Sequence, residues 1–195
     1  MRLLAAALLV VGALAAAGFA RHEDRIRQQD RLAVIASELA GRTVHVHCPS
    51  FLGGLVDTHG EAGRVQFDAS GRPADHTELA PETCKALRHL DRVDFSCIAS
   101  DSCSFSQFTA AWAAHTLAHE SFHLRGFADE GVTECYALQN TAFVAERLGV
   151  PPDQAKQLQA LVYEQGYPNE PEEYHSSKCY AGGPLDLRRQ DAVFP

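Results

Sequence analysis

The stretch SFSQFTAAWAAHTLAHESFHLRG, residues 104–126, predicts the helix around which the rest of the chain is organised. Ser104 and Gln107 form a capping-box pair, in which each side chain satisfies a backbone N–H at the start of a helix. An apolar run follows, and Gly126 is well placed to end the helix. The sequence therefore predicts one long helix with defined ends in the middle of the chain.

Two histidines on this helix predict a metal site. His119 and His123 are four residues apart, a spacing that corresponds to about 400° of rotation and about 6 Å of rise. Their imidazoles project from one face and can bind one ion, and two such nitrogens suit zinc. Glu120 is rotated by about 100° from His119, where its carboxylate can act on a water molecule without binding the metal. We expect Glu120 to be the general base of a hydrolytic site.

A catalytic zinc ion takes three protein ligands and keeps one position open, so a third ligand must come from elsewhere in the chain. A second helix is expected after Asp129, a good N-cap, and this helix can run back past the first. Glu134 lies about one turn into it and is the favoured third ligand. Glu130 lies one turn earlier on the same face and is the alternative, although an acidic residue there also interacts favourably with the helix dipole.

These residues resemble the gluzincin group of zinc metallopeptidases. HExxH at residues 119–123 is followed by ECYA at residues 134–137, which matches the E-x-x-A pattern that carries the third ligand in several compact members. More closely, the stretch 117–139 is similar to small membrane-anchored or exported HExxH proteins of high-GC bacteria. The resemblance covers roughly residues 115–140, a minority of the chain.

The resemblance implies one zinc ion per chain, with His119, His123 and Glu134 as ligands and Glu120 as the base. Gluzincins also provide a tyrosine or histidine that stabilises the oxyanion formed during hydrolysis. The sequence does not place this residue. The candidates are Tyr136, Tyr174 and His175.

Three side chains precede the motif on the same helix face. His115 stands one turn before His119 and is expected either to support a ligand or line the cleft, or to be a core histidine with satisfied hydrogen bonds. Trp112 and Phe108 extend the face backward, and we expect them in the core rather than facing a substrate.

The first twenty residues predict a signal peptide or an N-terminal membrane anchor, because an uncharged apolar stretch follows Arg2. Length does not separate the two, since about 18 residues is near the lower limit for spanning a bilayer. Residues 21–41 are highly charged and predict a stalk helix or, as an alternative, a helix packed on the domain edge. Residues 42–195 are then a zincin-like metallopeptidase domain with an irregular C-terminal tail.

All six cysteines follow this N-terminal segment, and their even number predicts disulfides and an oxidising compartment. Arginines just after residue 20 point the other way, because a basic flank holds a domain in the cytoplasm. We give the cysteines more weight and expect an extracytoplasmic protein, secreted or anchored to the cell membrane. Six cysteines allow fifteen pairings; Cys97 with Cys103 and Cys135 with Cys179 are two plausible ones.

The predicted fold class is α+β, a small antiparallel sheet packed with the zincin-type helix and the helices that follow it, after an N-terminal apolar helix. Strands are predicted at 44–47, 51–57 and 63–68. Helices are predicted at 81–91, 104–124, 129–148 and 152–165. His45 and His47 face one way on the first strand and could bind metal, but a solvent-facing surface explains them more simply, so we assign them no role.

The sequence leads us to expect an extracytoplasmic zinc-dependent peptidase that acts on a peptide or protein substrate. A formal charge of −8 and the absence of a polybasic run give no support for a nucleic-acid partner. The membrane is a partner only if the N-terminal segment stays uncleaved. The alternatives are a non-catalytic zinc-binding or sensing domain at the cell surface, and a binding module in which HExxH is coincidental.

Overall fold

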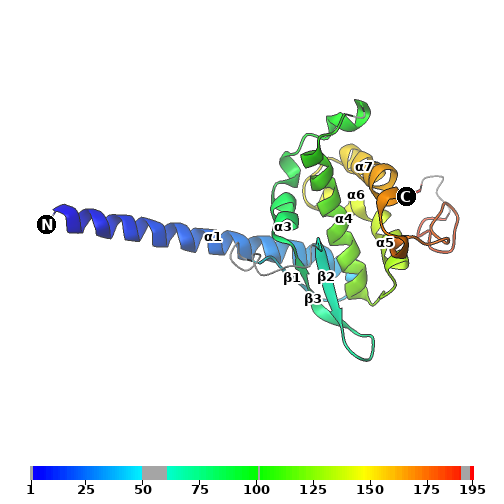
Figure 1. The fold of residues 1–195 in the computed structure, drawn as a ribbon, viewed down its shortest axis with the longest axis horizontal. Helices are drawn as coiled ribbons and strands as arrows, with labels where there is room; N and C mark the ends of the chain where they lie inside the picture. The colour runs from blue at the N-terminus through cyan, green and yellow to red at the C-terminus, as the bar shows by residue number, and fades with distance from the viewer. Residues whose placement is uncertain (1, 50–60, 101, 190–193) are drawn as a thin grey trace.

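A computed structural model describes residues 2–49, 61–100, 102–189 and 194–195, without the side chains of residues 2–17, 21 and 99. The fold is α+β, with a small sheet on one side of a group of helices (Figure 1). The elements follow in the order α1 (Arg2–Ala40), β1 (His45–His47), β2 (Gly63–Phe67), β3 (Pro73–Leu79), α3 (Pro81–Arg88), α4 (Phe105–Arg125), α5 (Glu130–Leu138), α6 (Thr141–Arg147) and α7 (Pro152–Leu161).

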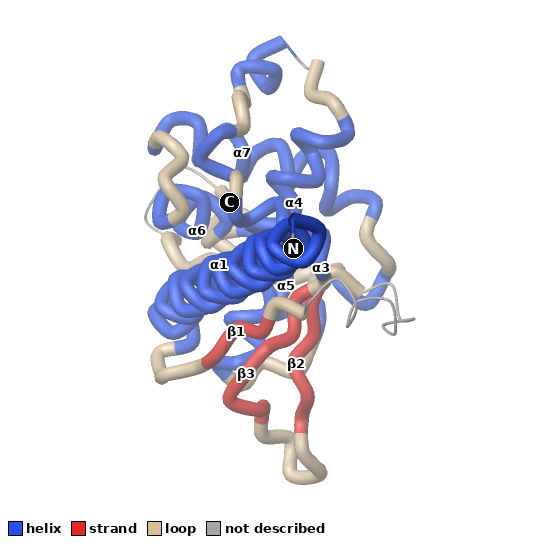
Figure 2. Tube along the Cα trace, turned by 90° about the vertical axis from the view of Figure 1, so that its left-hand side faces the viewer, coloured by secondary structure: helices blue, strands red, loops and turns tan. Residues whose placement is uncertain are grey.

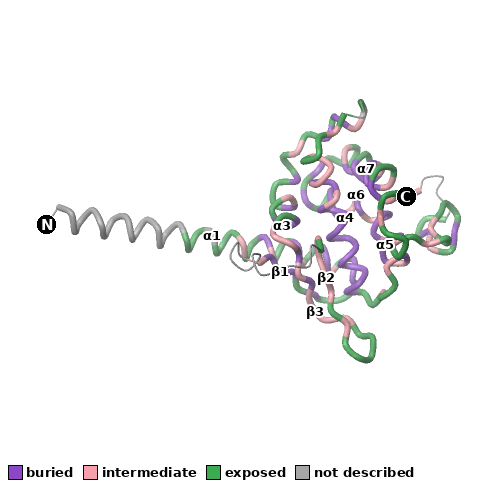
Figure 3. Tube along the Cα trace, viewed as in Figure 1, coloured by how far each residue is buried: buried purple, intermediate pink, exposed green. Residues whose placement is uncertain are grey.

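Helix α4 lies at the centre of the molecule, packed against α1, α3, α5, α6 and the strands β2 and β3. Most of it is buried (Figure 3), as expected for a helix with small or apolar residues on all sides. Its predicted ends are confirmed. Ser104 and Gln107 form the capping box, and Gly126 ends the helix with a left-handed backbone, φ 112°.

The C-terminal half of α1 belongs to the core. Leu32, Ile35 and Leu39 are buried, and the helix packs against α4 and β1. Figure 2 shows α1 crossing the molecule between the sheet and helices α6 and α7. The charged segment 21–41 thus contributes to the core. This arrangement corresponds to a helix packed on the domain, the alternative to a stalk helix.

The prediction of a signal peptide or anchor at residues 1–20 depends on side chains that lie largely outside the described part of the chain. The backbone of residues 2–20 is helical and continuous with the rest of α1. Among the helices whose residues are described, none is long and apolar enough to cross a membrane.

The sheet is mixed rather than antiparallel. Its order is β1-β3-β2, with β2 antiparallel to β3 but β1 parallel to β3. The central strand β3 was not predicted, because its sequence PADHTEL alternates only weakly and begins with proline. With β3 inserted between the other two strands, the direction of β1 follows from the topology rather than from its own sequence. The strand predicted at 51–57 lies outside the described residues.

The single helix predicted at 129–148 is two helices, α5 and α6. Side chains at the junction compete for the backbone carbonyls that would continue the helix. Gln139, Asn140 and Thr141 donate to the carbonyl oxygens of Cys135, Tyr136 and Ala137 at 2.8, 2.8 and 2.9 Å. The helix predicted at 152–165 is confirmed as α7 followed by a π-helical turn at Val162–Gly166, whereas the one predicted at 81–91 ends at Arg88.

Three disulfides use all six cysteines: Cys48–Cys84, Cys97–Cys103 and Cys135–Cys179. The two pairings suggested by the sequence are among them. Disulfides of this number persist in oxidising compartments, so the structure supports an extracytoplasmic location.

Candidate metal centre

Two buried imidazoles form the middle of the site. His119 and His123 lie one turn apart on α4, and their Nε2 atoms are 2.9 Å from each other. Glu130, the first residue of α5, brings Oε2 to 3.0 Å from Nε2 of His119 and 3.1 Å from Nε2 of His123. The two nitrogens and the oxygen therefore form a nearly equilateral triangle.

The other ring nitrogens determine where the protons of the two imidazoles lie. Nδ1 of His119 is 2.9 Å from Oε2 of Glu134, and Nδ1 of His123 is 2.7 Å from the carbonyl oxygen of Phe127. An ionised carboxylate and a carbonyl only accept hydrogen bonds, so both Nδ1 atoms donate. In the neutral rings the Nε2 lone pairs then face each other and the Glu130 carboxylate. Such a set of electron-pair donors needs a cation at its centre, so this group is suited to hold a metal ion.

The charges of the site also favour a cation beside the Nε2 atoms. Burial lowers the pKa of His119, but its hydrogen bonds to Glu130 and Glu134 outweigh burial and raise that pKa to about 10. Burial also raises the pKa of Glu130, but hydrogen bonds with His119 and His123 lower it to about 2. Both carboxylates thus attract a positive charge to the Nε2 atoms, whether a proton or a metal ion.

The structure brings Glu130, the alternative ligand, rather than the favoured Glu134 to both imidazoles. The sequence favours Glu134 as the residue facing both imidazoles, whereas Glu130 takes that position and Glu134 contacts the opposite nitrogen of His119. Helices α4 and α5 run in opposite directions, so the first turn of α5 meets His119 and His123 and the second meets His115 and His119. The register between the helices places Glu134 one turn too deep to reach His123.

Glu134 is buried and paired with a second histidine. Nε2 of His115 lies 3.0 Å from Oε2 of Glu134, which accepts a hydrogen bond, and 2.9 Å from Oε1. The contact with Oε1 lacks the direction of a hydrogen bond, so this oxygen has no hydrogen-bond partner among the described residues. The hydroxyl of Thr141 donates to the carbonyl oxygen of Ala137 at 2.9 Å. The hydroxyl oxygen therefore accepts from Nδ1 of His115 at 3.1 Å. Both ring nitrogens of His115 are thus held by hydrogen bonds, one to Thr141 and one to Glu134. Burial raises the pKa of Glu134, but the charge of His115 and the two histidine hydrogen bonds lower it to about 2.

Glu120 lies on the side of α4 that faces the sheet. Its side chain is buried, with Oε2 3.4 Å from Oγ1 of Thr77. Thr77 donates its proton to the carbonyl oxygen of Arg64 at 2.9 Å, so it gives the Glu120 carboxylate little stabilisation. Burial therefore raises the pKa of Glu120 to about 7, although the nearby imidazoles act against it. A side chain at Gly63 would not fit here, because its Cβ would lie 2.8 Å from Cγ of Glu120.

A cavity of about 700 Å³ joins these groups. His119, His123 and Glu130 line it together with Glu120. Strand β2 forms part of its wall, and within the described sheet β2 pairs with a neighbour, β3, on one side only. An edge strand therefore borders the candidate metal centre.

The C-terminal segment adds a tyrosine to this cavity. Tyr174 comes from a short turn at Glu172–Tyr174, and the centre of its ring is 5.6 Å from that of His119. Burial and then the nearby glutamates raise its pKa to about 12, so the hydroxyl stays protonated at neutral pH. Gly131 allows the segment to lie against α5, because a Cβ there would be 2.7 Å from the carbonyl oxygen of His175.

The other two oxyanion candidates point elsewhere. Tyr136 packs among aromatic rings with centres 5.4 and 5.0 Å away, and it does not line the cavity. His175 is exposed, with Nε2 3.0 Å from the carbonyl oxygen of Glu170. Of the three, Tyr174 alone shares the cavity with the histidines.

Sequence reasoning missed two residues of the cavity wall. Trp112 was expected in the core, yet it lines the cavity as well as packing against the core. Glu170 belongs to the irregular C-terminal tail, yet it is half-buried and lines the same cavity, and burial raises its pKa. Gly166 is the local signal for this arrangement, because any side chain there would collide with the Trp112 ring.

Comparisons of the chain with known protein families, with curated proteins and with solved structures find no match.

Proposed function

We propose that this protein is a zinc-dependent peptidase that acts outside the cytoplasm. The observation that carries the proposal is the convergence of His119, His123 and Glu130 on one point, beside a buried Glu120 in the wall of a large cavity. Two imidazoles and one carboxylate are a ligand set of catalytic zinc sites, which leave the fourth position to water or substrate, whereas structural sites use four protein ligands.

In this proposal Glu130 takes the ligand position for which the sequence favoured Glu134. When bound, zinc polarises a carbonyl oxygen and activates water for attack. Glu134 accepts a hydrogen bond from Nδ1 of His119 and so keeps Nε2 of that ring turned toward the ion. His115 hydrogen-bonds Glu134 and holds it in place.

Glu120 is the proposed general base. It accepts a proton from the attacking water molecule and passes it to the leaving amine. A pKa of about 7 allows Glu120 both to accept and to release this proton near neutral pH. Its contacts with the sheet keep the carboxylate in one position, since Gly63 and Thr77 lie directly against it.

An extended peptide is the substrate that the cavity fits best. Strand β2 is an edge of the described sheet and lines the cavity, and an edge strand can bind an extended chain through backbone hydrogen bonds. A carbonyl held near the ligands would lie within reach of the C-terminal segment. Tyr174, protonated at neutral pH, is the proposed donor to the oxygen on which negative charge develops.

The protein is proposed to reach its compartment through residues 1–20, as a cleaved signal peptide or as a membrane anchor. The apolar stretch after Arg2 favours either. The three disulfides fit the oxidising side of a membrane.

A peptide-library digest tests the proposal. The zinc-loaded full-length chain should cleave a subset of peptides, and Glu120→Gln should reduce turnover by about 10² to 10⁴ while zinc content stays at the parent value. Glu82→Gln, on the exposed surface of α3, is the matched control and should leave turnover unchanged.

Two results would contradict the peptidase proposal. A zinc-loaded parent that cleaves no peptide would favour the non-catalytic zinc-binding or sensing domain. Cleavage that persists undiminished in Glu120→Gln would show that the activity does not use this centre.

A further inference from the structure

The outer face of the sheet carries a second group of metal-binding side chains. Strands β1 and β3 lie side by side in parallel register, with His45 opposite His76 and His47 opposite Glu78. The residues between them, Val46 and Thr77, are buried toward the helices. Because side chains alternate along a strand, the three histidines and the glutamate all project to the other face.

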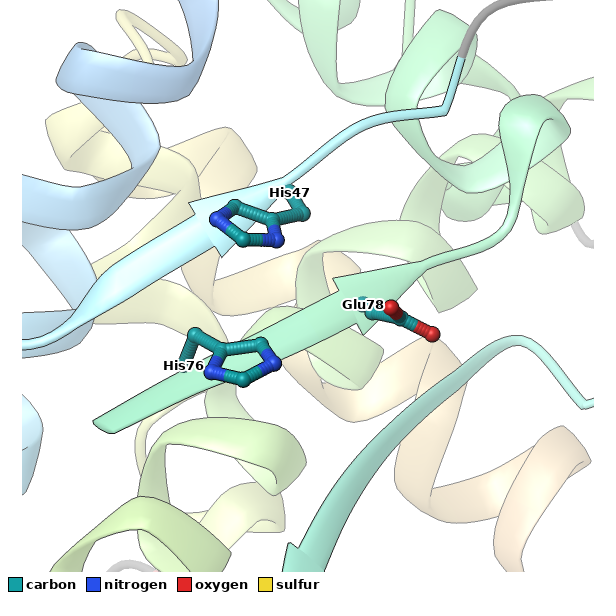
Figure 4. A group of neighbouring side chains, drawn as sticks. All are labelled: His47, His76 and Glu78. Atoms are coloured by element: carbon teal, nitrogen blue, oxygen red, sulfur yellow. The ribbon is translucent and has the colours of Figure 1, made fainter. Parts of the chain in front are cut away.

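Three of these side chains lie close to one another. The rings of His47 and His76 are stacked, with centres 4.8 Å apart and planes inclined by 25°. One ligand atom from each of His47, His76 and Glu78 lies within 4.8 Å of the others. Figure 4 shows the two imidazoles on neighbouring strands and Glu78 further along β3. The ligand atoms around one ion lie closer together than this. These side chains are exposed or half-buried, so rotation about their side-chain bonds can bring the ligand atoms together.

Neighbouring side chains orient the group. Nδ1 of His76 lies 3.0 Å from Oδ1 of Asp75, which accepts its proton and leaves Nε2 with a free lone pair. A carboxylate on the far nitrogen is the usual support of a metal-binding histidine. Glu78 is held by Arg64, whose Nε and Nη2 both donate to Oε2 at 3.1 and 2.6 Å.

We infer that His47, His76 and Glu78 form a second site for a divalent transition-metal ion, with zinc as the expected occupant. Two imidazoles and a carboxylate suit zinc, whereas magnesium and calcium prefer oxygen ligands throughout. The site shares no residue with the centre on α4, and the sheet separates the two. It is therefore independent of the proposed peptidase activity. Its exposure makes it the weaker of the two sites.

Zinc titration of the full-length chain by calorimetry tests this inference. The parent should bind two equivalents, one tight and one weaker. His47→Ala/His76→Ala should lose the weaker equivalent and keep the tight one, whose retention also shows that the variant is folded. Asp75→Asn should weaken the second equivalent by about 10- to 100-fold, because an amide supports the ring of His76 less strongly than a carboxylate does. His89→Ala, an exposed histidine at the end of α3, is the control and should bind as the parent does.

The inference is overturned if the parent takes up a single equivalent, or if a weaker second equivalent survives in His47→Ala/His76→Ala. A separate variant, His119→Ala/His123→Ala, assigns the tight equivalent. Loss of that equivalent with the weaker one retained is the expected result. Absence of a tight equivalent in the parent would count against the centre on α4 alone, so failures of the two sites can be distinguished.

Discussion

Glu130 and Glu134 are one helical turn apart and contact opposite nitrogens of the same imidazole, that of His119. The carboxylate beside Nε2 is placed to bind an ion directly. The carboxylate beside Nδ1 instead keeps the ring proton on Nδ1, so that Nε2 presents its lone pair. Two identical side chains therefore have different chemical roles because of where each meets the ring.

Glutamine substitutions separate these roles, since they keep the size of the side chain. Glu130→Gln removes the charged ligand and should lose zinc almost completely. Glu134→Gln can still accept from Nδ1 of His119 and should weaken zinc binding by about 10- to 100-fold. Competition with a chelator, followed by elemental analysis of the full-length chain, measures both. The reverse order would return the ligand role to Glu134, as the sequence favoured.

Among the elements, α1 combines an exposed face with a face that belongs to the core. Leu32 is 1% exposed and Val34, two residues later, is 60% exposed. Leu32→Ala should destabilise the protein by about 2–5 kcal/mol, since it removes buried methyl groups and leaves a cavity in the core. Val34→Ala should change stability by less than about 0.5 kcal/mol. Urea denaturation of the two variants measures the difference, and equal effects would mean that α1 is not part of the folded core.

At the scale of the whole molecule, the disulfide Cys135–Cys179 joins α5 to the C-terminal segment that carries Tyr174. Closing this loop of 44 residues stabilises the fold by about 4 kcal/mol in the chain-entropy model. It also keeps the segment beside the cavity, whereas the proposed ligands lie on α4 and α5 and are not part of that segment.

Cys135→Ala/Cys179→Ala should therefore lower peptidase turnover while zinc content stays near the parent value, and it should expose residues 166–183 to limited proteolysis. The control, Cys97→Ala/Cys103→Ala, opens a loop of 6 residues and should leave turnover unchanged. Zinc analysis, a peptide assay and proteolysis of the folded variants give the readouts. Loss of zinc together with turnover would mean that the bridge supports the ligands rather than the segment.

The sequence by itself determined the features that depend on neighbours within a turn or two. Ser104 and Gln107 at one end and Gly126 at the other set the bounds of α4. Four-residue spacing brought His119 and His123 together, and Asp129 caps α5 through the N–H of Val132 as expected. These signals are local, because a helix cap or a shared helix face involves residues close in the chain.

Only the tertiary structure decided which distant groups meet. The register of α5 on α4 placed Glu130 rather than Glu134 beside both Nε2 atoms, and nothing in either helix specifies that register. Insertion of β3 between β1 and β2 made the sheet mixed and brought His47 beside His76. Packing of the C-terminal segment on α5 brought Tyr174, rather than Tyr136 or His175, to the cavity. Each outcome depends on how whole elements pack, and packing sums many weak contacts that no short stretch of sequence contains.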